Sequence, residues 1–381
     1  MNTPTAMAQA AEASDLELQQ MLVDSVRRWG QGANGPQARA QSGQHVHGCP
    51  PERWRALAEL GWLGLDLPED EGGLGAGLTE VCLLAEQMGA CLLVEPFVAN
   101  AVLGRGVLTQ FASPAQRAQW LPDLVSGEHR LAWMAWEADG QALLRHPEAL
   151  AQRGSQGWTV SADLGWMPGA AGVDAVVLAA RLADAPQCIG VFRVDTRSPG
   201  VEMPTTRLYD GRHAARLHAT QAQAELLHEG PAGDVLQRLQ DVLDRGLIVH
   251  CAETLGSAQA VFQLSLDYLR TRRQFGQILS DKQVLQHRLV DLYVEQQEAR
   301  ALCLAAAAAP DARTVAALGL RTADVARHSW QEAIQLHGAI GMTEEYAAGE
   351  YVRRLAMADR LYGAATDHAE RLAQLMLGDQ A

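Results

Sequence analysis

Two stretches of this sequence decide its fold: Arg272-Arg273-Gln274-Phe275-Gly276, followed by Gln283, and Gln335-Leu336-His337-Gly338-Ala339-Ile340-Gly341. Each places glycines beside side chains that suit a phosphate-bearing ligand. A guanidinium fork matches two phosphate oxygens, an aromatic ring offers a stacking surface, and glycine allows the backbone to approach closely. The alternative is structural, with Arg272 as a solvated charge and Phe275 as a core residue of a helical bundle.

Long helical patterns surround the two stretches. Leu, Val and Ala recur at helical spacing through 235–271, 283–308 and 313–337, which predicts a bundle of three or four helices with short connections. Upstream, short runs of β-type residues are separated by Gly, Pro, Asp and Ser, which predicts a small sheet or barrel. These runs are 158–160, 175–180 and 189–194.

The first third of the chain also predicts helices. Apolar residues between Leu16 and Val26 recur at helical spacing, and Trp54 restarts this period after residues 30–50, whose Gly, Gln, Ser and His content predicts a loop. Thr79 is expected to cap a helix that runs to Met88. The whole pattern predicts four parts: a flexible terminus over 1–13, a helical domain over 14–128, a β domain over 129–231 and a helical bundle over 232–381.

Composition and charge argue against several classes of protein. A net charge of -14 and a sequence pI near 5.3 do not suit a nucleic-acid surface. The six cysteines form no CxxC pair and the histidines lack zinc spacing, so we expect neither disulfides nor a metal site. No G-x-S-x-G elbow supports serine catalysis. Neither a secretory signal nor an apolar run of membrane-spanning length is evident, so the cytoplasm is the expected location.

The ordered set of motifs resembles the acyl-CoA dehydrogenase family over nearly the whole chain. R-x-x-F-G begins at Arg272, and Q-x-x-G-x-x-G begins at Gln335. Earlier, Trp54…Gly61-Trp62 and Pro68-Glu69…Gly72-Gly73-Leu74-Gly75 are similar to two amino-terminal motifs of that family. The resemblance implies an α+β multidomain fold, with an N-terminal α-helical domain, a middle β-barrel or sheet domain and a C-terminal four-helix bundle.

The resemblance also implies a cofactor. Members of the family bind FAD, and these carboxy-terminal motifs meet the ADP half of FAD bound mainly on the neighbouring subunit. The residues implied in cofactor binding are Arg272, Phe275, Gln283, Gln335, Leu336, His337 and Gly338, together with Trp166, which packs on the flavin in relatives. The usual second glycine of the later motif is replaced by Ala339.

The expected catalytic base is missing from its usual place. Family chemistry moves the α proton of a thioester to a carboxylate, while a hydride leaves the β carbon for the flavin. In most members a Glu follows a Tyr in a Y-E-G-T stretch. Depending on a one-residue shift, the matching position here holds Tyr362 or Gly363. Neither residue provides a carboxylate.

Other members carry the Glu on a different helix, at a position that corresponds to Gly246. Asp244 and Glu253 lie near it on the same predicted helix, and Glu253 is two turns from Gly246 and therefore on nearly the same face. Either residue is a weak candidate for a relocated base. The alternative for each is a surface or interface carboxylate.

The flavin-contacting β domain departs from the family as well. Trp136 replaces the flavin-bonding Thr of T-E-P, and Pro168 replaces the hydroxyl residue of W-x-T, while Trp166 is kept. Proline also lacks the backbone N–H that could donate in place of the hydroxyl. These changes fall on the chain's own flavin face, whereas the segments that reach a neighbour's FAD are mostly kept.

This asymmetry suggests the partner subunit of a hetero-oligomeric acyl-CoA dehydrogenase, which oxidises an acyl-CoA to the trans-2-enoyl-CoA with a second, related polypeptide. By analogy, such enzymes act on bulky thioesters from steroid or dicarboxylate breakdown. One alternative is a self-sufficient homo-oligomer, a dimer or tetramer, with Glu253 or Asp244 as base. Another is a cofactor-free structural relative.

Overall fold

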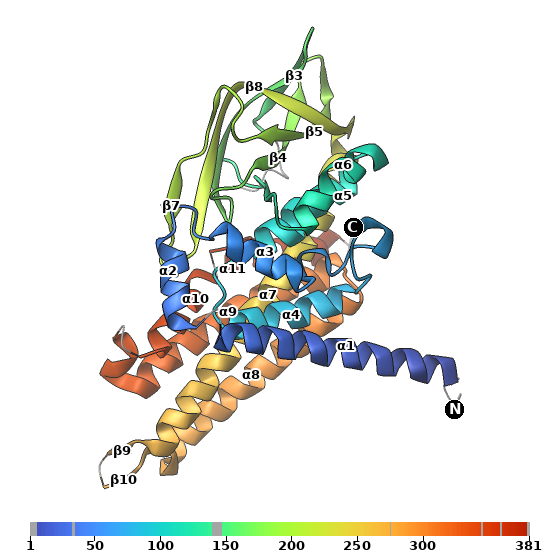
Figure 1. Ribbon diagram of the computed structural model, residues 1–381. Coiled ribbons are helices and arrows are strands. Elements are labelled where there is room, and N and C mark those ends of the chain that lie inside the picture. The colour runs from blue at the N-terminus through green and yellow to red at the C-terminus, as the bar shows by residue number, and fades with distance from the viewer. Residues whose placement is uncertain are drawn as a thin grey trace. The chain divides into compact units, whose positions relative to one another are not determined.

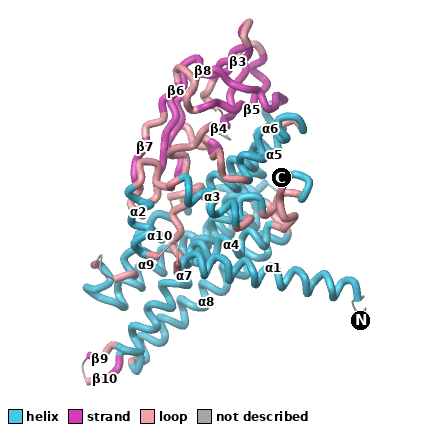
Figure 2. Tube along the Cα trace, in the orientation of Figure 1, coloured by secondary structure: helices cyan, strands magenta, loops and turns pink. Residues whose placement is uncertain are grey.

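The computed structural model of the protein describes residues 6–32, 35–138, 147–274, 276–343, 346–358 and 360–378. The chain forms two compact units (Figure 1). We call residues 1–38, 77–93 and 248–381 the helical unit, and residues 39–76 and 94–247 the mixed unit. Among the described residues, the strands gather in the mixed unit (Figure 2), and the helical unit carries only the short strands β9 (Arg273–Gln274) and β10 (Gln277–Ile278).

Three long helices form the centre of the helical unit. They are α7 (Ala232–Thr271), which belongs to this unit from Ile248 onward, α8 (Gln283–Ala308) and α9 (Ala312–His337). Helix α9 packs against α8, α10 (Ala348–Ala358) and α11 (Ala365–Gly378), and α4 (Leu78–Ala90) packs against α8 and α1 (Ala6–Gln31). The bounds of α7, α8 and α9 confirm the helical periods predicted from the sequence.

The mixed unit contains an eight-stranded sheet. Its strands are β1 (Leu131–Trp133), β2 (Leu150–Gly154), β3 (Gly157–Pro168), β4 (Ala175–Leu182), β5 (Ala185–Asp195), β6 (Val201–Glu202), β7 (Thr205–Arg207) and β8 (His213–Pro231). The order is β1-β4-β2-β3-β8-β5, and β5 also pairs with β4, so that five strands close into a ring. This ring confirms the predicted small sheet or barrel.

Short helices complete the mixed unit. They are α2 (Pro36–Gln44), most of which lies in this unit, α3 (Pro51–Glu59), the single turns η1 (Trp62–Gly64) and η2 (Glu69–Glu71), the π-helix η3 (Val98–Gly104), α5 (Arg105–Phe111) and α6 (Pro114–Val125). All seven residues of η3 are buried. Its last residue, Gly104, lies so close to Leu131 of β1 that a Cβ atom would overlap the Leu131 carbonyl oxygen. Glycine therefore allows this helix to contact the sheet directly.

Two local predictions were wrong. Residues 30–50 were expected to be a loop, but Pro36–Gln44 forms α2, because Pro suits a first helical turn and the Gln, Ala and Arg residues that follow are good helix formers without any apolar period. Helix α4 is capped at Gly77 instead of Thr79, since the Glu80 carboxylate accepts the Gly77 N–H at 3.0 Å. Helix α1 spans Ala6–Gln31, and the predicted boundary between a terminus over 1–13 and a helical domain from 14 stays a prediction.

Helices α4 and α7 cross in direct backbone contact. A Cβ atom on Gly89 would overlap the carbonyl oxygen of Glu253, and one on Gly256 would overlap the carbonyl oxygen of Glu86. The Ser257 hydroxyl donates to the Gly89 carbonyl at 2.9 Å. The two glycines are therefore the reason that these helices approach so closely.

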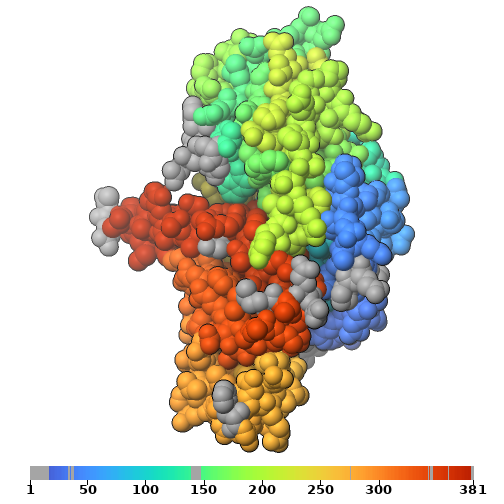
Figure 3. All heavy atoms as spheres, turned by 90° about the vertical axis from the view of Figure 1, so that its left-hand side faces the viewer, coloured from blue at the N-terminus to red at the C-terminus, as the bar shows by residue number. Residues whose placement is uncertain are grey.

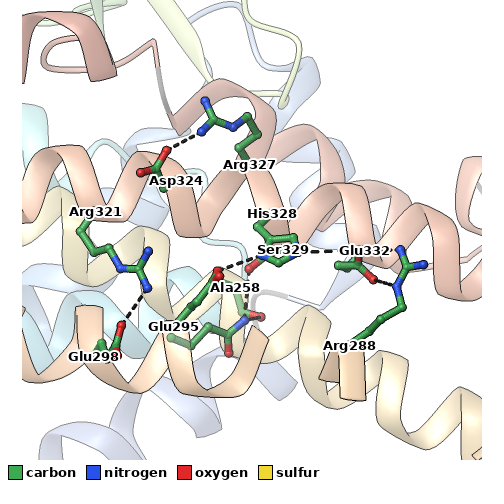
Figure 4. Close-up of polar contacts among 11 residues, drawn as sticks. Ala258, Arg288, Glu295, Glu298, Arg321, Asp324, Arg327, His328, Ser329 and Glu332 are labelled. Carbon is green, nitrogen blue, oxygen red and sulfur yellow. Dashed lines mark hydrogen bonds and ion pairs between the residues drawn. The ribbon is translucent and has the colours of Figure 1, made fainter. Parts of the chain in front are cut away.

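Polar contacts also join α7, α8 and α9 to one another (Figure 4). The Gln296 amide of α8 donates to the Ser329 hydroxyl of α9 at 3.1 Å and to the Ala258 carbonyl of α7 at 3.2 Å. This buried amide joins three helices and defines their register. Within the described residues, no helix combines the length and the apolar character that crossing a membrane requires.

Candidate functional site

A small apolar core brings the two deciding stretches together at one end of the helical unit. Leu269 at the end of α7, Leu279 in the turn η4 (Leu279–Asp281), Leu289 in α8 and Leu336 in α9 are all buried in one cluster. Residues 272–283 and 335–341 are thereby anchored to the same cluster, although about fifty residues separate them in sequence. We call these two stretches the hairpin end, and Figure 3 shows the first of them, in gold, at the surface.

The hairpin end exposes some of the predicted cofactor-binding residues and buries others. Arg272, Gln283, Gln335 and Gly338 are exposed, whereas Leu336 belongs to the apolar cluster. Phe275 lies outside the described residues. The exposed side chains are free of the core and carry the donors and acceptors that a phosphate or an adenine requires.

His337 has a mainly structural environment. Its ring lies 4.7 Å from the Tyr268 ring and 5.1 Å from the Tyr346 ring, measured between centroids. Nδ1 donates to the Ala333 carbonyl at 2.8 Å, and burial lowers the pKa of the imidazole. These contacts hold the His337 ring in place within this chain, and its predicted contact with ADP remains a prediction.

The positions expected at the flavin face adjoin each other in the mixed unit. The Gly165 N–H donates to the Trp136 carbonyl at 2.8 Å, and Glu137 forms a bridge with Leu164 of β3. Trp166 is 44% exposed, which is unusual for so large an apolar side chain, and Trp136 is half-buried. Pro168 ends the strand without an N–H or a hydroxyl. The face therefore presents Trp136 and Pro168 at the two positions where the family resemblance leads us to expect hydroxyl donors.

The usual position of the base is a packed turn, residues 361–363, which we call the base turn. Tyr362 is 6% exposed, has φ of 60°, and its ring lies 5.0 Å from the His250 ring. Gly363 has φ of 112°, and a Cβ atom there would lie 2.9 Å from the His368 ring. The base turn therefore has little space for a carboxylate in the conformation that it adopts here.

The alternative position also has no space. A Cβ atom on Gly246 would overlap the side chain of Leu103, which belongs to η3 in the mixed unit. Asp244, two residues earlier, is half-buried and accepts the Gln240 amide at 2.7 Å. The geometry gives Asp244 a local hydrogen-bond role, and its role as a base remains a prediction.

A buried carboxylate lies next to this part of α7. Asp66 contacts the guanidinium groups of Arg105 and Arg245, the latter at 2.5 Å. Burial alone would raise the pKa of Asp66, but the two arginines outweigh it and hold the pKa below its usual value. Asp66 is therefore a structural anion of the mixed unit.

Glu253 is held by an arginine that the sequence did not single out. Its Oε1 lies 3.1 Å from Nη1 of Arg354, and its Oε2 lies 3.6 Å from Nδ1 of His250. The side chain of Glu253 is 12% exposed and that of Arg354 is 4% exposed. The i, i+3 spacing of His250 and Glu253 on one helix could have predicted that these two side chains meet. Arg354 could not be predicted in this way, because it is 101 residues away in sequence.

No group of three or more potential metal ligands occurs among the described residues, and all six cysteines are unbridged. Cys49, Cys82, Cys251 and Cys303 are buried. The burial of these four side chains is typical of cysteines that pack as small apolar residues.

Comparison with known proteins identifies a family that matches this chain. The model of the acyl-CoA dehydrogenase N-terminal domain matches residues 17–128, and that of the acyl-CoA dehydrogenase C-terminal domain matches residues 236–376. The probable acyl-CoA dehydrogenase YngJ of Bacillus subtilis is 28% identical over 376 residues, which cover 93% of this chain and 96% of that protein.

Solved structures share the fold over nearly the whole chain. A variant of the Tcur3481-Tcur3483 steroid ACAD has a TM-score of 0.84 and 25% identity, covering 97% of this chain and 99% of that one. The ChsE4-ChsE5 complex from Mycobacterium tuberculosis gives a TM-score of 0.83 at 22% identity, with 99% of both chains covered. Together the two family models span well over half of the sequence. The chain therefore belongs to the acyl-CoA dehydrogenase family and has the fold of that family.

Proposed function

We propose that this chain is one subunit of a hetero-oligomeric, FAD-dependent acyl-CoA dehydrogenase. The enzyme would convert an acyl-CoA thioester to the trans-2-enoyl-CoA, and a second, related polypeptide would supply the catalytic carboxylate. Membership of the family makes the chain an oxidoreductase that acts on acyl-CoA. The division of the active site between two polypeptides goes further than membership.

The observation that carries the proposal is a contrast between two sets of residues. At the hairpin end, Arg272, Gln283 and Gln335 are exposed and suit the ADP half of FAD. At the base turn and at Gly246, by contrast, a carboxylate is absent and the space is filled by neighbouring side chains. A chain with this contrast can support a cofactor that serves a partner but lacks its own base.

The residues of this chain fit FAD in part. The exposed Arg272 guanidinium would bind phosphate oxygens, and Gln335 and Gln283 would hydrogen-bond the nucleotide. The indole of Trp166 would pack against the isoalloxazine ring. Bound FAD would supply the acceptor for the hydride that leaves the β carbon. Pro168 offers the ring no hydrogen bond, which weakens this chain's own flavin face.

Two of the similar structures support a divided enzyme, because each consists of two named polypeptides. These are Tcur3481-Tcur3483 and the ChsE4-ChsE5 complex. One of them is a steroid ACAD. We extend the proposal to a bulky, steroid-derived acyl group as the substrate class. A panel that compares a short linear acyl-CoA with a steroid-bearing acyl-CoA tests this extension through the ratio of their kcat/KM values.

The test of the proposed function is flavin binding by the chain alone and by the chain with a related subunit. The chain alone should be colourless, and co-expression with a related subunit that carries both T-E-P and a carboxylate base should give a yellow complex that reduces a dye with acyl-CoA. The related subunit expressed alone is the control. Stoichiometric flavin and full activity in the lone chain would refute the divided site and favour a homo-oligomer.

A further inference from the structure

A buried polar cluster joins α7, α10 and the end of α4 inside the helical unit. Arg354 on α10 donates from Nη1 to Glu253 on α7 at 3.1 Å, and from Nη2 to the carbonyl of Leu93 at 2.8 Å. Leu93 lies three residues after the end of α4 at Ala90. A guanidinium group suits this task, because its planar fork can reach a carboxylate and a carbonyl at the same time.

His250 extends the cluster in the other direction. Nε2 lies 3.2 Å from the carbonyl of Ala358, the last residue of α10, and Nδ1 faces Glu253. The same ring packs edge-on against Tyr362 of the base turn. Because a carbonyl can only accept, Nε2 donates to Ala358, and this hydrogen bond together with the Tyr362 packing fixes the imidazole beside Glu253.

Backbone strain is concentrated at the two ends of this cluster. Among the described residues, the non-glycine residues with positive φ are Leu92, Gln221 and Tyr362. Leu92 precedes the carbonyl that Arg354 binds, and Tyr362 packs on His250. A bulky residue keeps a left-handed conformation only where its surroundings over-determine it.

The helix crossing adds the necessary rigidity. Glu253 lies at the point where α7 meets Gly89 of α4, and the Gly89 carbonyl accepts the Ser257 hydroxyl. The end of α4 cannot shift along α7 without breaking this contact. Arg354 therefore binds α7 through Glu253 and binds the backbone that follows α4 through the Leu93 carbonyl.

We propose that Glu253, Arg354 and His250 form a clamp that holds the strained backbone at Leu92 and at the base turn, and that Glu253 is the anion of this clamp and not the proton acceptor for substrate. The first part stands independently of the proposed function. The second part rests on it, because the substrate proton must then go to a carboxylate of the partner.

Amide hydrogen exchange of the complete complex tests the clamp. In Glu253→Gln and in Arg354→Met, peptides that contain Leu92 and Tyr362 should exchange about tenfold faster or more, since one buried charge loses its partner. In the double variant, the increase in exchange rate should be smaller than the product of the two single increases, because neither the Glu253 carboxylate nor the Arg354 guanidinium remains. Unchanged exchange at both peptides, or an additive double variant, would overturn the clamp.

Two further variants guard against a general loss of folding. Arg354→Lys keeps the charge but not the fork, so its exchange should lie between the wild type and Arg354→Met. Glu298→Gln is the matched control, because Glu298 pairs with Arg321 at 2.8 Å in the same unit and its side chain is 62% exposed. It should leave both peptides unchanged, and acceleration equal to that of Glu253→Gln would overturn the proposal.

The role of Glu253 as an anion is tested separately. The pH profile of acyl-CoA oxidation should keep its acidic limb in Glu253→Gln, because the proton acceptor lies elsewhere. Loss of that limb, or inactivity with unchanged amide exchange, would identify Glu253 as the base. Inactivity with accelerated exchange supports the clamp. A lone chain that is yellow and active would refute the proposed function yet leave the exchange result intact.

Discussion

The hairpin end and the base turn belong to the same helical unit but differ in how they use their side chains. The hairpin end buries leucines and exposes Arg272, Gln283 and Gln335. At the base turn, by contrast, both side chains are buried, since Leu361 and Tyr362 are 4% and 6% exposed. The family resemblance predicts a cofactor segment at the hairpin end and a catalytic segment at the base turn, and of the two only the hairpin end has exposed polar side chains.

Under the proposed function, family motifs persist in one part of the site and are lost in another. A segment that binds a cofactor across a subunit boundary keeps its function as long as the partner binds that cofactor. A segment that holds the base is released from this constraint when the partner supplies the carboxylate. It can then be filled by packing, as Tyr362 and His250 fill it here.

Removal of Arg354 should give the largest effect. Arg354→Met leaves Glu253 buried without its main charge partner and leaves the Leu93 carbonyl without a donor, which should cost about 3 kcal/mol of unfolding free energy. Urea unfolding of the complex measures this loss. A change below about 1 kcal/mol would mean that the cluster is solvated and that the base turn is not rigid.

Removal of Arg272 should affect binding and leave folding unchanged. Because Arg272 is exposed, Arg272→Ala should leave the urea midpoint of unfolding unchanged. The dissociation constant of FAD from the complex should rise about ten- to a hundredfold. Flavin fluorescence during dilution measures the change. Arg321→Ala, which removes another arginine that is not at the hairpin end, is the control and should retain FAD fully.

The two regions should share one pH effect, because each contains a buried histidine. Burial lowers the pKa of His368, which packs on the base turn, and that of His337 at the hairpin end, both from 6.5. Each folded-state histidine therefore binds fewer protons than in the unfolded chain. The contribution of each histidine to the free energy of unfolding is therefore greatest above pH 6.5. Below that pH the free energy of unfolding falls by at most about 1.4 kcal/mol per pH unit for each histidine.

The variants His368→Gln and His337→Gln should each flatten this acid dependence, and unfolding free energies at several pH values below 6.5 measure it. A steeper dependence in either variant would contradict the assignment, because it would require the histidine to bind its proton more tightly in the folded chain.

The sequence predicted the large elements and the position of the hairpin end, because both depend on local signals. The apolar periods of α8 and α9 span whole helices, and glycines mark the motifs beside Arg272 and Gln335. The helix α2 was missed, since Pro36–Gln44 has no apolar period and its helix depends on propensity alone. The boundaries of the three domains remain a prediction.

The clamp could not be predicted from local sequence patterns. Glu253 was noticed as a possible base, but its partner Arg354 lies 101 residues away, and no spacing rule links two residues at that distance. The restricted space at Gly246 was hidden for the same reason, because it depends on Leu103 of another helix. Long-range packing decided what each residue of the candidate site could do.

The smallest expected effect concerns ion pairs that join α8 to α9 (Figure 4). Arg288 binds Glu332 with Nε and Nη2 at 2.8 and 2.6 Å, and the Glu332 side chain is only 10% exposed. Arg321 binds Glu298 through one nitrogen, and Glu298 is largely exposed. Glu332→Gln should cost about 1 kcal/mol, whereas Glu298→Gln should cost less than about 0.5 kcal/mol.

Urea unfolding at low and high salt separates the two cases. Salt screens the exposed pair, so the small cost of Glu298→Gln should vanish, while that of Glu332→Gln should largely remain. If the two variants lose the same unfolding free energy as each other at low and at high salt, burial does not decide the strength of these pairs. Such a result would weaken the same reasoning at Glu253, where burial distinguishes a clamp from a surface contact.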